Sequence, residues 1–185
     1  MIKWQRTFWM VLALAAVLLG GCAGGGADRP AEDREPSEEE ATASKITFEG
    51  TDLEGNTVSS DIFAQSKITM VNVWATYCNP CLSEMPELGE LAEEYSEEDF
   101  QLIGIVSDVL EGEDQSLVES LVQQTGADYT HLLLNESIYY AMLTDVTGVP
   151  TTFFLDGEGT VLDRVRGAKE KSVWEEKIDA LLEER

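Results

Sequence analysis

Basic side chains are scarce in this sequence. Its 185 residues include 12 Lys and Arg against 36 Asp and Glu, which gives a formal net charge of −24. Nucleic-acid backbones are bound by clustered Lys and Arg, so this composition argues against a protein that binds DNA or RNA. The hydrophobic content of 43% is close to that of ordinary globular proteins, so a folded domain with its own core is expected.

Cysteine and histidine are also rare, with three cysteines and one histidine in the whole chain. Three cysteines are too few for a disulfide-stabilised scaffold. Their spacing also differs from that of zinc fingers and ribbons, which supply four ligands in paired clusters. No metal site is therefore expected, and each cysteine has to be interpreted on its own.

The apolar run near the N-terminus is shorter than the roughly 20 residues of a membrane-spanning helix. Phe8 to Leu19 makes 12 residues, preceded by two bases and followed by Gly20-Gly21-Cys22. This order predicts a signal peptide over residues 1–21. The sequence Leu19-Gly20-Gly21-Cys22 resembles the bacterial lipoprotein box, which implies lipid on the Cys22 sulfur and anchoring to the cell membrane. Two alternatives to a lipoprotein signal remain open: an ordinary secretory signal peptide and an uncleaved membrane anchor.

Residues 23–44 contain no Leu, Ile, Val, Met, Phe, Trp or Tyr. Such a segment cannot bury enough apolar surface to order itself, because nothing offsets the loss of conformational entropy. We therefore expect a lipidated Cys22 and a disordered acidic linker over residues 22–44, followed by one folded domain over residues 45–185.

Residues 45–185 alternate between strand and helix patterns. An N-terminal hairpin is predicted by residues 46–49 and 57–58, which flank a turn-rich stretch. Further strands are expected at 68–74, 100–106, 131–134, 151–155 and 160–165, and helices at 81–95, 116–124, 137–146 and 170–184. This order predicts an α/β fold with a mixed central sheet flanked by helices on both faces.

The sequence Cys78-Asn79-Pro80-Cys81 follows a buried strand and opens a helix, a context typical of a redox-active CxxC. Free N–H groups and the dipole at a helix start stabilise a thiolate, so Cys78 is expected to be the nucleophile. Cys81, one turn further in, is expected to be the shielded resolving thiol. A metal site would need more ligands than two cysteines and His131.

The segment from Trp74 to Cys81, WATYCNPC, resembles the signature of thioredoxin-like proteins, and Gly148-Val149-Pro150-Thr151-Thr152 resembles their cis-proline loop. With the signal, linker and hairpin, the chain looks like the TlpA/ResA group of membrane-anchored extracytoplasmic thiol-disulfide oxidoreductases. The resemblance implies a thioredoxin-like fold with an insertion before the cis-Pro loop. It also implies a redox centre formed by the Cys78–Cys81 disulfide, without another cofactor.

The same resemblance implies that substrates dock beside Pro150 and Val149, with Tyr77 and Trp74 nearby. Tyr77 stands where Trp is usual in the family. Trp74 is expected chiefly to pack in the core.

Asn72 stands where cytoplasmic thioredoxins carry a buried Asp that assists proton transfer. Glu84 is the candidate replacement, since a Glu at this position in the ResA-like group is implicated in tuning the cysteines. Glu84 could equally be one more solvated acid on an acid-rich helix. His131 is expected to be a strand-edge residue without a catalytic role.

These features predict a lipid-anchored thiol-disulfide oxidoreductase, most simply a reductase of substrate protein disulfides. The resemblance implies apocytochrome c, a methionine sulfoxide reductase or a peroxidase as partners, and a membrane thiol transporter as the source of electrons. Three alternatives remain: an oxidant that introduces disulfides, a non-catalytic binding module such as a metallochaperone, and a peroxidase. A peroxidase needs Thr three residues before its cysteine, whereas Thr76 lies only two residues before Cys78.

Overall fold

The computed structural model describes residues 45–185. The predicted signal peptide over 1–21, Cys22 and the linker over 22–44 lie outside the described residues. Within residues 45–185, no helix is both long and apolar enough to cross a membrane.

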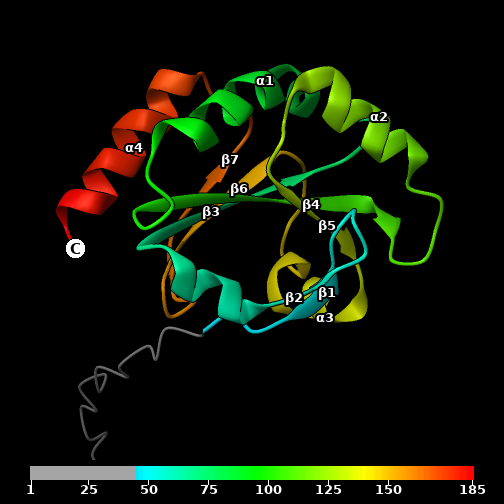
Figure 1. Cartoon of the computed structure of the whole chain (residues 1–185), viewed down its shortest axis with the longest axis horizontal. Coiled ribbons are helices and arrows are strands. Elements are labelled where there is room, and N and C mark those ends of the chain that lie inside the picture. The colour runs from blue at the N-terminus through cyan, green and yellow to red at the C-terminus, as the bar shows by residue number, and fades with distance from the viewer. Residues whose placement is uncertain (1–44) are drawn as a thin grey trace, which may run out of the picture. The chain divides into compact units, whose positions relative to one another are not determined.

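The described chain is an α/β structure in which strands and helices largely alternate (Figure 1). The strands are β1 (Glu49–Thr51), β2 (Thr57–Ser59), β3 (Ile68–Trp74), β4 (Phe100–Leu110), β5 (Thr130–Leu134), β6 (Thr151–Asp156) and β7 (Val161–Arg166). The helices are η1 (Ser60–Gln65), α1 (Asn79–Glu94), α2 (Ser116–Thr125), α3 (Glu136–Ile138), η2 (Tyr139–Leu143) and α4 (Lys171–Glu183).

The central sheet is mixed, as predicted, and has the strand order β5-β4-β3-β6-β7. β3 lies in its middle, parallel to β4 and antiparallel to β6. All seven residues of β3 are buried, which explains why its sequence is a nearly continuous apolar run. The N-terminal hairpin forms a separate two-stranded sheet of β1 and β2.

Helices cover both faces of this sheet. In Figure 1, α1, α2 and α4 lie above it, while η1, the hairpin and α3 lie below. The alternation along β3 divides the core accordingly, because successive side chains of a strand point to opposite faces. Val71 and Val73 pack in one cluster with Phe63, whereas Met70 packs with Leu88 of α1 in another.

Three elements differ clearly from the sequence-based expectation. The first strand of the hairpin, expected over 46–49, is β1 at Glu49–Thr51. The helix expected over 137–146 is instead a short α-helix continued by a π-helical turn that ends at Leu143. It begins earlier because the Asn135 side chain accepts a hydrogen bond from the N–H of Ile138, 2.9 Å away, and so caps it. The strand expected over 100–106 continues to Leu110, although its pairing with β5 shifts register after Val106.

Candidate active site

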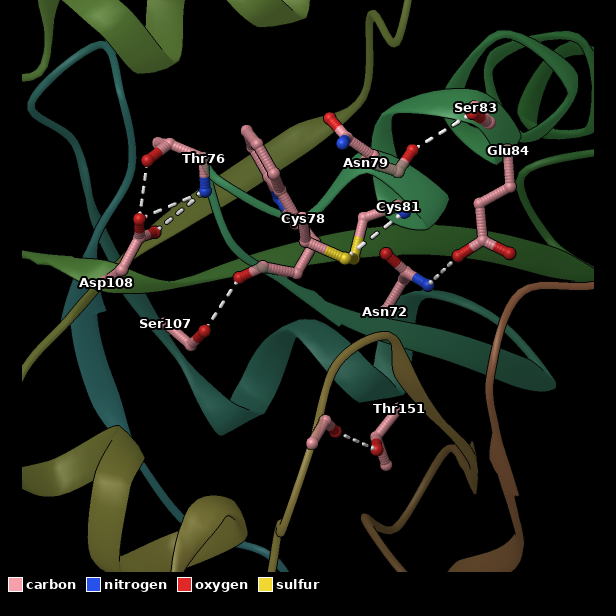
Figure 2. Close-up of a disulfide and its surroundings, with 12 residues drawn as sticks. Asn72, Thr76, Cys78, Asn79, Cys81, Ser83, Glu84, Ser107, Asp108 and Thr151 are labelled. Atoms are coloured by element: carbon pink, nitrogen blue, oxygen red, sulfur yellow. Dashed lines mark hydrogen bonds between the residues drawn. A yellow bond between two sulfur atoms is a disulfide. The ribbon is translucent and has the colours of Figure 1, made fainter.

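The two cysteines of the CxxC motif meet where β3 ends and α1 begins. They form a disulfide in this structure, with their Cα atoms 5.3 Å apart (Figure 2). Cys78 is the residue that caps α1, and its sulfur accepts a hydrogen bond from the N–H of Cys81 at 3.2 Å. Cys78 keeps 6% of its surface exposed and Cys81 none, so an incoming group reaches Cys78 first.

The position of Cys78 matches the requirement for a stabilised thiolate. A helix start presents N–H groups without partners inside the helix and the positive end of the helix dipole. The N–H of Cys81 already points at the Cys78 sulfur in the disulfide form. The local sequence therefore places the more accessible sulfur where negative charge is favoured.

The proline loop lies beside the cysteines. The Val149–Pro150 peptide bond is cis, as the resemblance implied. Val149 packs against the core cluster that contains both Cys78 and Cys81. The carbonyl of Pro150 accepts a hydrogen bond from the N–H of Gly167 at 2.9 Å, which ties the loop to the end of β7. Two segments far apart in the sequence thus pack against the same core cluster.

Two aromatic residues precede the cysteines and have opposite environments. Tyr77 is 75% exposed, so its ring is available to a docking partner. Trp74 is fully buried and has no surface that a substrate could touch in this structure. The burial of Trp74 supports a packing role, while Tyr77 remains a candidate substrate contact.

Glu84 is buried rather than solvated, with only 4% of its surface exposed. The interpretation of Glu84 as one more surface acid is therefore wrong. Its Oε1 accepts a hydrogen bond from Nδ2 of Asn72, and its Oε2 accepts one from the N–H of Lys169, each at 3.1 Å. Burial raises the pKa of this carboxyl above its usual value, and the two hydrogen bonds partly oppose that rise.

Glu84 lies three residues after Cys81, on the next turn of α1, and Figure 2 shows it on the same side as Asn72. Residues three apart are neighbours on a helix surface. A carboxyl with a raised pKa in such a place can take up and return a proton. The site therefore combines two thiols with one buried acid.

His131 belongs to a buried hydrogen-bond network that the sequence analysis missed. Its Nδ1 accepts a hydrogen bond from Nε1 of Trp74 at 3.2 Å, and its Nε2 lies 2.9 Å from the carbonyl oxygen of Ala127. The indole can only donate, so the imidazole is assigned as neutral with its proton on Nε2. Burial lowers the pKa of His131 to about 4, consistent with this form.

Gly104 of β4 makes room for that network. It is the register partner of His131, and a Cβ atom at Gly104 would lie 2.2 Å from the Nδ1 of His131. No local signal marks either residue, because the network joins Trp74 to a histidine 57 residues away. Only the pairing of β4 with β5 brings them together.

Two residues of β4, Ser107 and Asp108, also reach the site without having been predicted. Asp108 accepts hydrogen bonds from the N–H and the hydroxyl of Thr76, two residues before Cys78 (Figure 2). Ser107 donates to the carbonyl of Trp74 at 2.8 Å. Across residues 45–185, no three His, Cys, Asp or Glu side chains gather as ligands for a metal ion.

Comparison with known proteins identifies the class of this chain. The model of the AhpC/TSA family matches residues 42–164. The thiol:disulfide interchange protein DsbE of Escherichia coli (strain K12) is 30% identical over 177 residues, covering 93% of this chain and 89% of that protein. The thiol-disulfide oxidoreductase ResA of Bacillus thuringiensis subsp. konkukian (strain 97-27) is 30% identical over 129 residues, covering 70% and 71%.

A solved structure agrees with this assignment. The crystal structure of a thioredoxin-family thiol:disulfide interchange protein from Chlorobium tepidum TLS aligns with a TM-score of 0.64 at 25% identity. The alignment covers 75% of this chain and 94% of that one. The fold, the CxxC pair and these relatives agree: the chain belongs to the AhpC/TSA family and is a thioredoxin-fold thiol-disulfide oxidoreductase of the DsbE/ResA type.

Proposed function

We propose that this oxidoreductase works as a reductase of protein disulfides outside the cytoplasm, held at the bacterial cell membrane by lipid on Cys22. The observation that carries the exchange mechanism is the unequal exposure of the two cysteines. Cys78 reaches the surface at the start of α1, and Cys81 is buried behind it. The substrates proposed are apocytochrome c, a methionine sulfoxide reductase or a peroxidase.

The proposed reaction has two exchange steps. The Cys78 thiolate attacks one sulfur of a substrate disulfide, forming a mixed disulfide and releasing the other substrate sulfur as a thiolate that takes up a proton. Cys81 then loses its proton, attacks the Cys78 sulfur and releases the second substrate thiol. The substrate gains two electrons and two protons, and the enzyme is left with the Cys78–Cys81 disulfide.

Glu84 is proposed to accept the proton that Cys81 loses. Support comes from its burial, from the raised pKa of its carboxyl and from its place one helical turn beyond Cys81. Docking of the substrate backbone is proposed at the cis-Pro loop, where Val149 packs against the cysteine cluster. An extended substrate would lie there next to the Cys78 sulfur and the exposed ring of Tyr77.

The enzyme must be reduced again after each turnover. A membrane thiol transporter that carries electrons from inside the cell is the proposed donor, since the outer compartment is oxidising. The reduction potential separates this role from that of an oxidant. A reductase is expected near about −270 mV, whereas strong oxidants lie near about −120 mV.

Trapping of the mixed disulfide tests the proposal. In Cys81→Ser, Cys78 can still attack but nothing inside the protein releases the substrate, so dithiothreitol-sensitive complexes should accumulate on non-reducing gels. Cys78→Ser is the matched control and should trap nothing. The identity of the trapped proteins chooses among the proposed substrates. Absence of complexes, together with failure of the wild type to reduce insulin, would contradict the reductase role.

The anchor has its own test. Cys22→Ala in the full chain should move the protein from the membrane fraction to the soluble or secreted fraction, and labelling with a radioactive fatty acid should be lost. Unchanged membrane retention would contradict lipid anchoring and favour an uncleaved apolar anchor near residues 8–19.

A peroxidase role is less well supported by the site. The hydroxyl of Thr76 donates to Asp108, as does its N–H, so both groups are engaged away from the cysteine pair. Consumption of hydrogen peroxide by the reduced protein, measured without other redox partners, would reverse this preference.

A further inference from the structure

Strand β4 holds the segment that precedes the nucleophile by side chains rather than by backbone pairing. The pairing of β3 with β4 ends at Trp74 and Val106. Immediately beyond it, the hydroxyl of Ser107 donates to the carbonyl of Trp74 at 2.8 Å. The carboxylate of Asp108 accepts hydrogen bonds from the N–H of Thr76 at 3.0 and 3.1 Å, and another from its hydroxyl.

The shape of β4 explains how these two side chains reach the loop. β4 pairs with β5 up to Val106, loses register, and pairs again at Leu110. A bulge of this kind bends a strand and redirects its side chains, and bulges are over-represented next to active sites. Here the irregular stretch contains Ser107 and Asp108, whose side chains make hydrogen bonds to the segment between β3 and α1 (Figure 2).

Apart from the burial of Ala75 and Cys78 in the core and the Cys78–Cys81 disulfide, few contacts hold the loop between β3 and α1 (residues 75–78). Ala75 has no polar side chain, and the side chain of Tyr77 is 75% exposed. Within the described residues, the other hydrogen bond of the loop is local, from the N–H of Cys78 to the carbonyl of Ala75 at 3.0 Å. Hydrogen bonds to a carboxylate are stronger than neutral ones, so Asp108 accepts the strongest hydrogen bonds of the loop.

We propose that Ser107 and Asp108 are positioning residues that fix residues 74–76 and thereby hold the Cys78 sulfur at the start of α1, where its thiolate is stabilised. The two residues touch neither the substrate nor the sulfurs; they act through Thr76 and Trp74. This role rests on the proposed chemistry of Cys78. It adds a second support for the site, separate from the buried Glu84.

The experiment compares Asp108→Ala with a control that loses the same kind of contact elsewhere. Asp156 also accepts two backbone N–H groups of a turn, from Glu158 at 3.0 Å and Thr160 at 2.8 Å. It pairs with Ile68, at the opposite end of β3 from the cysteines. Asp156→Ala should therefore lower the free energy of unfolding but leave Cys78 unaffected.

The measurement is the rate of Cys78 alkylation by iodoacetamide as a function of pH, in reduced protein that also carries Cys81→Ser. In Asp108→Ala the midpoint should move toward the roughly 8.5 of a free cysteine, and the rate at pH 7 should fall roughly three- to tenfold. Asp156→Ala should keep the parent profile. A profile in Asp108→Ala that superimposes on the parent would overturn the proposal.

Three further variants keep the test decisive. Asp108→Asn retains an oxygen that can accept from the N–H of Thr76, so its midpoint should not rise as that of Asp108→Ala does. Loss of the negative charge alone would lower the midpoint, because a nearby carboxylate disfavours a thiolate. A rise as large as that of Asp108→Ala would therefore contradict positioning through these hydrogen bonds. If Asp108→Ala does not fold, Thr76→Val and Ser107→Ala each remove one contact. Both should shift the midpoint in the same direction, and no shift in either would overturn the proposal.

The alkylation profile needs no substrate. A wild type that fails to reduce insulin would therefore contradict the reductase function while this test still reports on the role of Asp108.

Discussion

The amide of Asn72 donates a hydrogen bond from Nδ2 to Oε1 of Glu84 inside the molecule, across 3.1 Å. The same Nδ2 also donates to the hydroxyl of Thr152 at 3.1 Å, which links β3, α1 and β6. A neutral amide at position 72 leaves Glu84 as the buried carboxyl near the cysteines. A carboxylate at position 72 would instead oppose the charge of Glu84 at close range.

Glu84→Gln should change the pH dependence of both exchange and stability. The pKa of Glu84 is higher in the folded protein than in the unfolded chain. The protonated carboxyl therefore contributes stability that is fully present below the unfolded pKa of about 4.3 and is lost as the pH rises through the folded pKa. The stability of the wild type relative to Glu84→Gln should therefore fall as pH rises from 4 to 8. Urea unfolding of both oxidised proteins across this range measures it.

The exchange rate gives the second measurement on Glu84. If the carboxylate of Glu84 accepts the proton of Cys81, the wild-type rate of disulfide reduction should increase with pH over the range in which Glu84 ionises. This increase should be absent in Glu84→Gln. Glu87→Gln is the matched control, because Glu87 lies one turn further along α1 and its carboxylate also accepts a backbone hydrogen bond, from the N–H of Lys171 at 2.7 Å. Superimposable profiles for wild type and Glu84→Gln would return Glu84 to a structural role.

Cys78 should alkylate faster than Cys81 in the reduced protein at pH 7. The reason is that Cys78 caps α1 and keeps 6% of its surface exposed, whereas Cys81 is fully buried. Limited iodoacetamide treatment followed by peptide mass spectrometry assigns the modified residue. Equal labelling, or a preference for Cys81, would reverse the roles assigned to the two sulfurs.

Acid should destabilise the protein through His131. Because burial lowers its pKa to about 4, the neutral ring contributes stability that is fully present above the unfolded value of about 6.5 and is lost as pH falls through 4. The separation corresponds to roughly 3 kcal/mol at low pH. His131→Gln should lack this loss between pH 6.5 and 4, measured by urea unfolding. If the free energy of unfolding of both proteins falls equally as the pH is lowered, the loss comes from the titration of other groups.

Gly104→Ala should destabilise the fold by about 1–3 kcal/mol, because its Cβ would overlap His131 at 2.2 Å and force the ring away from Trp74. The loss should be smaller in a protein that already carries His131→Ala, so a double-mutant cycle measures the coupling. Gly148→Ala is the control for stability, since a Cβ there would meet no atom within 4 Å. Equal losses with and without His131 would contradict this steric account.

Residues close together in the sequence determined much of the site. A buried strand, a CxxC and a helix start are consecutive, so the chain itself places Cys78 at the cap of α1 and Cys81 one turn further in. The cis peptide before Pro150 was implied by the resemblance of residues 148–152 to the cis-proline loop of thioredoxin-like proteins, and it is present. Local patterns suffice here because the spacing of neighbouring residues fixes their geometry.

Partners distant in the sequence were decided by the tertiary structure alone. The sequence left open whether Glu84 tunes the cysteines or is one more solvated acid of an acid-rich helix. Glu84 is buried in the fold, where Asn72 of β3 and the backbone of Lys169, 85 residues away, donate hydrogen bonds to it. His131 is likewise neutral because strand pairing places it against Gly104 and Trp74. Periodicity reports which face of an element is apolar, but the identity of a hydrogen-bond partner depends on which elements pack together.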